Sequence, residues 1–279
     1  MGMQLKKAEK KKVKLKVGFS GPSGFGKTYS ALLMAYGMCG DWTKIAVIDS
    51  ENGSASLYSN LGEFNTINLE PPFTPERYIE AIKTCEDAGM EVIIADSITH
   101  EWDGEGGCLE IYEQLGGRYQ DWAKVTPRHR RFVNKILQTD THFITCVRKK
   151  QDYDMVKDGN KTKVVKVGMK EVTREGFEYE LTLNLDLAND KHLCKASKDR
   201  TGLFMDRPEF IVTIETGKEL MAWANTGVDE KQYLIESIQG ANNREEGTTI
   251  WNNNVRYQSD EDVIVAFKAF AVKFPKDAK

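Results

Sequence analysis

Eight residues near the start of the chain limit its possible folds more than any other feature. Residues 21–28 read GPSGFGKT and fit the pattern G-x-x-x-x-G-K-[ST], whose glycines let backbone N–H groups curve around a phosphate. Apolar residues alternate with lysine or glycine over residues 13–19, which predicts a strand, and residues 29–39 predict a helix that ends at Gly40. A strand, a glycine-rich loop and a helix in this order predict a phosphate site at the helix N-terminus. A glycine-rich turn without a ligand is the alternative.

The residue types in this loop indicate how it would bind a nucleotide. Lys27 is long enough to reach the β- and γ-phosphate oxygens, and the Thr28 hydroxyl is a ligand for Mg²⁺. We therefore expect ATP and Mg²⁺ as cofactors. The predicted nucleotide-binding residues are Gly21, Pro22, Ser23, Gly24, Phe25, Gly26, Lys27, Thr28 and Tyr29.

Short apolar segments alternate with helical patterns along the first 150 residues. This alternation predicts a parallel α/β sheet, with further strands at residues 44–49, 91–97 and 142–147 and helices from Thr74 to Gly89 and from Thr126 onward. After residue 150 we expect strands at 177–187, 191–197 and 210–216, the last two antiparallel, and helices at 218–225, 229–241 and 259–273. Residues 240–258 have the composition of a linker.

The predicted fold class is therefore α/β. It has a mainly parallel central sheet, antiparallel strands added after residue 160 and a small helical C-terminal extension. The predicted organisation is a basic N-terminal tail (1–12), a core domain (13–225) and the helical extension (226–279).

Composition excludes several classes of protein. Of the 279 residues, 40% are hydrophobic and 29% are charged, close to the globular average, which argues against disorder, collagen and coiled coil. No apolar run reaches 18 residues, so we expect no membrane contact, and the lysine-rich start lacks the apolar segment of a signal peptide. The five cysteines contain no C-x-x-C pair, which argues against a structural zinc site or a disulfide framework and favours a cytoplasmic location.

Charge is unevenly distributed, although the net charge is only −3. Residues 1–16 carry +6, residues 86–121 carry −9 and residues 123–150 carry +7. Such blocks are typical of contacts with a polyanion or of head-to-tail self-assembly, and a solvated surface is the alternative.

Two acidic residues follow predicted strands. Asp96 ends an apolar strand and is the expected magnesium ligand, together with Thr28. The next residue is Ser97, so the paired Asp-Glu of many helicases and AAA+ ATPases is missing. Glu51 follows the preceding strand and is the predicted base, because the ends of parallel strands open onto the same edge of a sheet. The alternatives are a turn or capping role for Asp96 and a surface loop position for Glu51.

The order of these motifs resembles a known family. The P-loop, then IDSE at 48–51, then VIIADS at 92–97 is similar to the core of the RecA/RadA recombinases. The strings GPSGFGKTYSALLMA, IDSENGSA, PPFTPERYIEAI, DSITHEW and KDRTGLF resemble more specifically the short phage ATPases with a RecA-like core, some of which are single-strand annealing proteins. The resemblance covers roughly residues 10–225 and implies a RecA-like P-loop ATPase.

The resemblance also implies roles for basic residues. Arg148 takes the place of a γ-phosphate sensor, where the RecA pattern has glutamine, and Lys198 and Arg200 take the place of residues that reach the nucleotide of a neighbouring subunit. A mobile basic loop that contacts DNA would span residues 149–175. Its expected DNA-binding residues are Lys149, Lys150, Tyr153, Lys161, Lys163, Lys166, Lys170 and Arg174. Solvated surface charges or an ordinary hairpin are the alternatives.

Together these features predict a Mg²⁺-dependent ATP hydrolase with Lys27, Glu51, Asp96, Arg148, Lys198 and Arg200 as catalytic residues. The expected partners are single-stranded DNA, further copies of the chain in a filament or ring, and a single-strand-binding protein. The expected role is phage-type homologous recombination or single-strand annealing. Two alternatives stay open: a nucleotide-gated assembly switch with little turnover, and a P-loop nucleoside or nucleotide kinase. The chain has no N-K-x-D motif, which argues against a GTPase.

Overall fold

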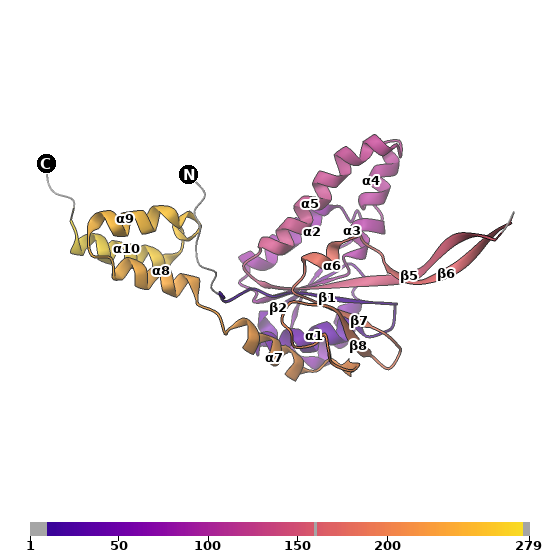
Figure 1. Ribbon diagram of the computed structural model, residues 1–279, viewed down its shortest axis with the longest axis horizontal. Helices are drawn as coiled ribbons and strands as arrows, with labels where there is room; N and C mark the ends of the chain where they lie inside the picture. Colours follow the sequence, from indigo (N-terminus) through magenta and orange to yellow (C-terminus); the bar gives the residue numbers. More distant parts are fainter. Residues whose placement is uncertain (1–9, 159–160, 276–279) are drawn as a thin grey trace. The chain divides into compact units, whose positions relative to one another are not determined.

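The computed structural model describes residues 10–158 and 161–275 and divides the chain into two compact units (Figure 1). One unit comprises Lys14–Trp223, and the other combines the segment before Lys14 with the segment from Ala224 onward. Among the described residues, no helix has both the length and the apolar character that a membrane span requires.

A central sheet organises the larger unit. Its strand order is β3-β2-β4-β5-β1-β7-β8-β9, and neighbours from β3 to β7 are parallel, whereas β8 and β9 are added antiparallel. This order confirms the predicted α/β fold class, with a mainly parallel central sheet and added antiparallel strands. The strands are β1 (Lys16–Gly21), β2 (Ile45–Asp49), β3 (Asn65–Asn68), β4 (Val92–Asp96), β5 (His142–Asp158), β6 (Lys161–Glu171), β7 (Leu183–Leu187), β8 (Leu193–Asp199) and β9 (Phe210–Ile211).

Helices cover both faces of this sheet. α2 and α5 lie on one face, and α1 and α7 lie on the other (Figure 1). Every residue of β1, β2 and β4 is buried, as expected for parallel strands between two helical layers. The elements are α1 (Lys27–Cys39), η1 (Trp42–Lys44), η2 (Ser54–Leu61), α2 (Pro75–Asp87), α3 (Thr99–Asp103), α4 (Cys108–Gln114), η3 (Tyr119–Asp121), α5 (Trp122–Gln138), α6 (Phe177–Glu180) and α7 (Ile214–Ala224).

The predicted helix starting at Thr126 begins one turn earlier. α5 starts at Trp122 and contains Pro127 in its interior. The Trp122 ring stacks on Tyr112 at 4.3 Å between centroids, and Val125 is fully buried. This packing extends the helix beyond the position that the proline suggests, because tertiary contacts outweigh local preference.

Two predicted strands are shorter than expected. The segment predicted as a strand over 177–187 starts with the helical turn α6, and only Leu183–Leu187 is a strand. Phe177 and Leu181 both belong to the core beneath α2 and α5, and their spacing of four residues fits a helical turn as well as an alternating strand. The predicted strand at 210–216 ends at Ile211, because α7 begins at Ile214.

The predicted basic loop is instead a hairpin. β5 continues past the sheet and pairs antiparallel with β6, from Lys149 opposite Glu171 to Asp158 opposite Lys161. The hairpin projects away from the sheet (Figure 1). The pairing shifts register between Asp152 and Tyr153.

The smaller unit is helical. It contains α8 (Glu230–Gln239), α9 (Arg244–Asn253), η4 (Val255–Tyr257) and α10 (Glu261–Lys273). The backbone of Lys12 donates to Val228, so part of the predicted N-terminal tail pairs within this unit. The predicted linker at 240–258 is wrong, because it contains α9. Asn243 caps that helix by accepting from the Glu246 N–H at 2.9 Å, and Trp251 stacks on Phe267.

Candidate functional site

The loop between β1 and α1 has the backbone geometry that a phosphate site requires. Gly24 and Gly26 have φ angles of 83° and 90°, in the left-handed region that glycine adopts most readily. Lys27 is buried, and its Nζ donates to the carbonyl oxygens of Gly21 at 3.0 Å and Pro22 at 2.9 Å. The ammonium group is thus held within the curve of the loop.

His192 closes over this loop from the turn between β7 and β8. Its Nδ1 lies 2.9 Å from the carbonyl oxygen of Phe25. A Cβ atom on Gly26 would lie 2.7 Å from the same nitrogen, so a larger residue there would displace the His192 ring. No sequence pattern had indicated His192.

Thr28 and Asp96 meet at the end of β4. The Thr28 hydroxyl donates to Asp96 Oδ2, and Asp96 is almost completely buried. Burial raises the pKa of Asp96 to about 6, and the hydrogen bond from Thr28 opposes this increase. A hydroxyl and a carboxylate are hard oxygen ligands of the kind that Mg²⁺ prefers, so the donor set fits that ion.

Glu51 forms a two-point ion pair with Arg148. Arg148 Nε lies 2.7 Å from Glu51 Oε1, and its terminal nitrogen lies 2.7 Å from Oε2. Burial opposes ionisation of Glu51, yet the hydrogen bond and the positive charge of Arg148 outweigh burial and lower the pKa of this carboxyl. Glu51 is therefore an ionised carboxylate with both oxygens engaged.

Buried polar contacts position this pair. Ser50 Oγ donates to the carbonyl oxygen of Ser97 at 3.0 Å and lies 2.8 Å from His100 Nδ1. The backbone N–H of Arg148 donates to Thr99 Oγ1 at 2.9 Å. The ends of β2, β4 and β5 are thereby connected, and sequence reasoning had assigned no role to Ser50 or Thr99.

One cavity brings several of the predicted groups together, although Arg148 is not among its lining residues. It has a volume of about 350 Å³, and we call it the P-loop cavity. Its lining residues are Ser23, Gly24, Gly26, Lys27, Thr28, Tyr29, Glu51, Tyr58, Asp96 and His192. The Tyr29 and Tyr58 rings lie 5.7 Å apart, so the cavity joins a phosphate-type loop, two carboxylates and an aromatic wall.

A larger cleft lies at the base of the β5–β6 hairpin. It has a volume of about 1020 Å³, and we call it the aromatic cleft. Trp102 and Trp122 stack at 5.7 Å within it, and Tyr119 is 91% exposed. Its lining residues include Trp102, Asp103, Leu109, Tyr119, Trp122, Lys150, Lys170 and Arg174.

Several basic residues predicted to bind DNA have protein partners. Lys149 lies 2.7 Å from Asp186, Lys150 lies 3.2 Å from Asp103, and Lys170 pairs with Glu175. Arg174 donates to Thr126 Oγ1 at 3.0 Å. Tyr153 and Lys166 are exposed on the hairpin. Lys161 and Lys163 belong to β6, but their side chains fall outside the described part of the structure.

Lys198 and Arg200 do not line the P-loop cavity of their own chain. Arg200 donates to the carbonyl oxygen of Tyr179 at 2.8 Å, and burial lowers the pKa of Lys198. Lys198 lines a different cavity, together with Lys149 and Tyr179. A contact between either residue and a nucleotide would require a second copy of the chain.

We compared the sequence and the structure with those of known proteins. The chain matches no curated protein. Among solved structures, a KaiC-like protein from the hyperthermophilic archaeon Pyrococcus horikoshii OT3 shares 13% identity over 70% of this chain and 83% of that chain, with a TM-score of 0.41. Residues 13–213, more than half of the chain, match the family model described as an AAA domain. The chain therefore belongs to the AAA domain family of P-loop ATPases.

Proposed function

We propose that this AAA domain protein hydrolyses ATP with Mg²⁺ and that hydrolysis controls its binding to single-stranded DNA and its assembly with further copies. The observation that carries the proposal is that Lys27, Asp96 and Glu51, from three separate segments, line one cavity. The resemblance of the sequence motifs to phage ATPases supports a proposed role in phage-type recombination or single-strand annealing, with a single-strand-binding protein as a further proposed partner.

The cavity residues have distinct roles in this proposal. The loop N–H groups and Lys27 bind the β- and γ-phosphates, while Thr28 and Asp96 hold the metal ion. When bound, Mg²⁺ neutralises phosphate charge. Glu51 orients the attacking water and accepts its proton.

Arg148 determines when Glu51 can act. While both carboxylate oxygens of Glu51 are engaged by the guanidinium, the carboxylate is a weak base. A γ-phosphate is a competing acceptor for Arg148, since guanidinium binds phosphate in the same two-point geometry. Nucleotide binding would thus release Glu51, in keeping with a sensor role for Arg148.

The aromatic cleft supports the single-stranded DNA part of the proposal. The exposed Tyr119 ring and the half-buried Trp102 and Trp122 rings lie in the same cleft as two lysines and an arginine, a combination that can bind single strands by stacking and phosphate contacts. The lysines would exchange their carboxylate partners for DNA phosphates. Binding should therefore be independent of sequence and weaken strongly with salt.

A nucleotide-gated switch with little turnover is the second candidate function. The observation that favours it is the same Glu51–Arg148 pair, because a base held by arginine gives slow hydrolysis. The two candidate functions predict different rates of ATP hydrolysis but the same binding of nucleotide.

Substitution of Glu51 tests the hydrolysis proposal. Glu51→Gln should bind ATP normally but lose hydrolysis by about 100- to 10,000-fold, the range for removal of a general base. Steady-state phosphate release and nucleotide titration measure the two effects. Glu63→Gln, an exposed acid beyond η2, is the matched control and should hydrolyse ATP as the wild type does.

Two results would contradict this assignment. Normal hydrolysis by Glu51→Gln would remove Glu51 from the mechanism. Negligible hydrolysis by the wild type, with and without single-stranded DNA, would favour the nucleotide-gated switch.

A further inference from the structure

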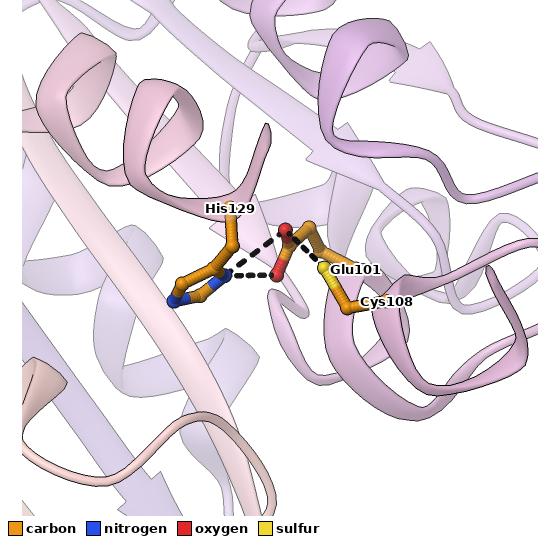
Figure 2. Close-up of side chains that lie close together, drawn as sticks. All are labelled: Glu101, Cys108 and His129. Atoms are coloured by element: carbon orange, nitrogen blue, oxygen red, sulfur yellow. Dashed lines mark hydrogen bonds and ion pairs between the residues drawn. The ribbon is translucent and has the colours of Figure 1, made fainter. Parts of the chain in front are cut away.

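Three side chains that commonly bind metals converge in the interior of the larger unit. Glu101 on α3, Cys108 on α4 and His129 on α5 each offer one ligand atom, and these atoms lie within 4.8 Å of one another. Figure 2 shows the Glu101 carboxylate between the other two side chains. Within residues 10–158 and 161–275, it is the one such group of three or more His, Cys, Asp or Glu side chains.

The distances are close to those of a coordination shell. His129 Nδ1 lies 3.0 and 3.1 Å from the two Glu101 oxygens, and Cys108 Sγ lies 3.2 Å from Oε1. Zinc bonds of about 2.0–2.3 Å in tetrahedral geometry place ligand atoms about 3.5 Å apart. Outward shifts of about half an ångström would give the Glu101–His129 and Glu101–Cys108 contacts the separation of two ligands of one ion, and all ligand atoms already lie within 4.8 Å of one another.

Burial of the Glu101 carboxylate favours binding of a cation at this cluster. Glu101 and Cys108 are fully buried and His129 is 5% exposed. A carboxylate can accept about four hydrogen bonds, whereas two side chains approach Glu101 among the described residues. Zn²⁺ with one thiolate, one carboxylate and one neutral imidazole has no net charge, which a buried site favours.

The surrounding fold holds the ligands in place. A tight turn brings Cys108 back to Glu101, and a Cβ atom on Gly107 would lie 2.9 Å from the Glu101 carbonyl oxygen. The Trp102 ring meets the His129 imidazole edge-on at 5.3 Å. His129 also lines a cavity of about 210 Å³.

We propose that Glu101, Cys108 and His129 bind Zn²⁺, with water as the fourth ligand. The absence of C-x-x-C pairs argued against a structural zinc site, but that rule concerns sites with paired cysteines, and this one uses a single cysteine. The ion would join α3, α4 and α5. Because these helices contribute Trp102, Leu109 and Trp122 to the aromatic cleft, zinc would stabilise the cleft walls.

Metal analysis of the untagged full-length protein tests the proposal directly. We expect about one Zn²⁺ per chain after zinc loading and dialysis. Cobalt substitution should produce the strong near-ultraviolet absorption of a cobalt–thiolate bond. X-ray absorption of the zinc-loaded protein should show one sulfur ligand per ion. Saturating zinc should raise the Tm by about 5–10 °C over the chelator-treated protein.

Cysteine variants locate the site. Cys108→Ser should lose the cobalt–thiolate absorption and the zinc-dependent rise in Tm. Cys85→Ser, which replaces another buried cysteine, should retain both. Cys146→Ser should also retain both, although Cys146 lies close to the carboxylate of Asp96.

Several outcomes would overturn the proposal. Absence of both bound zinc and cobalt–thiolate absorption in the wild type would do so, and so would a zinc ion without a sulfur ligand. Loss of the absorption in Cys146→Ser, with retention in Cys108→Ser, would place the metal at the P-loop cavity instead. If Cys108→Ser is insoluble, the X-ray absorption of the zinc-loaded wild type tests the proposal, because it shows whether zinc has a sulfur ligand. None of these measurements depends on ATP hydrolysis or DNA binding.

Discussion

The P-loop cavity and the aromatic cleft belong to the same unit but arrange their charged groups differently. In the cavity, Lys27 is buried and its ammonium donates to backbone carbonyl oxygens of its own loop. In the cleft, Lys150 and Lys170 are exposed and pair with surface carboxylates. The cavity is thus shaped by backbone, whereas the cleft has charges that can change partners. We therefore expect strict dependence on single residues in the cavity and graded effects in the cleft.

Among the variants that compare the cavity with the cleft, loss of the P-loop lysine should have the largest effect. Lys27→Ala should reduce ATP hydrolysis by about 100- to 1000-fold, because it removes a buried charge that stabilises the transferring phosphoryl group. Binding of single-stranded DNA without nucleotide should stay close to wild type, since Lys27 is not part of the cleft. Phosphate release measures ATP hydrolysis, and fluorescence anisotropy measures binding of single-stranded DNA. An equal loss of both activities would show that the two sites are not separable.

The next largest expected effect is on single-stranded DNA binding, when an aromatic ring on which a base stacks is removed from the cleft. Tyr119→Ala should weaken single-stranded DNA binding by about 5- to 150-fold, because one stacked base contributes roughly 1–3 kcal/mol. Tyr119 is 91% exposed, so its removal should not disturb folding. Tyr233→Ala, at an exposed position of α8, is the matched control. Unchanged DNA affinity in Tyr119→Ala would move the DNA site away from this cleft.

The sequence predicted the cavity far better than the cleft, for a physical reason. A phosphate loop needs contiguous residues, so residues 21–28 show it directly. Asp96 and Glu51 could be placed near it because parallel strands end at one edge of a sheet. His192 could not, because it contacts Phe25 of the loop from a turn 167 residues farther along the chain.

The cleft and the buried cluster depend on tertiary packing that no local pattern records. Trp102 and Trp122 belong to two different helices, α3 and α5, and their rings become neighbours through the packing of those helices. Glu101, Cys108 and His129 likewise have no diagnostic spacing. The same limit explains why α9 was predicted as a linker, since its residues are mostly polar.

β5 connects the two sites. Arg148 pairs with Glu51 at the cavity, and Lys150, two residues farther along, pairs with Asp103 at the cleft. Thr99, on the same helix as Asp103, accepts from the backbone of Arg148. A change of partner at either residue would therefore act on the same strand and on α3. This is a short physical route by which nucleotide state and DNA binding could influence each other.

A smaller effect tests the exchange of partners in the cleft. Asp103→Asn removes the carboxylate that pairs with Lys150, so it should strengthen single-stranded DNA binding by up to about 5-fold, within the range of an exposed ion pair. Titrations at low salt measure the change. Asp87→Asn, at the exposed Lys83–Asp87 pair of α2, is the control and should leave the affinity unchanged. Weaker binding by Asp103→Asn would mean that Lys150 does not contact phosphate.

The smallest expected effect is on the pH dependence of activity and stability when the Glu51–Arg148 pair is removed. Arg148 lowers the pKa of Glu51 and burial raises it, so Arg148→Ala should move the acid limb of kcat/KM to higher pH. The folded-state pKa of Glu51 lies below its ordinary value of 4.5, so the pair stabilises the folded protein above that pH. This contribution is lost as pH falls through the lowered pKa, and exposure of Arg148 limits it to about 1 kcal/mol.

Urea unfolding of wild type and Arg148→Ala at pH 7 and at pH 3.5 measures this difference. The stability gap between them should be larger at pH 7 and shrink at pH 3.5. Arg131→Ala removes an arginine from an exposed pair with Glu76 and is the control. The acid limb of kcat/KM should not move in this variant. An unchanged acid limb in Arg148→Ala would show that Arg148 does not control the ionisation of the base. The link between the cavity and the cleft would then have to run through a different contact.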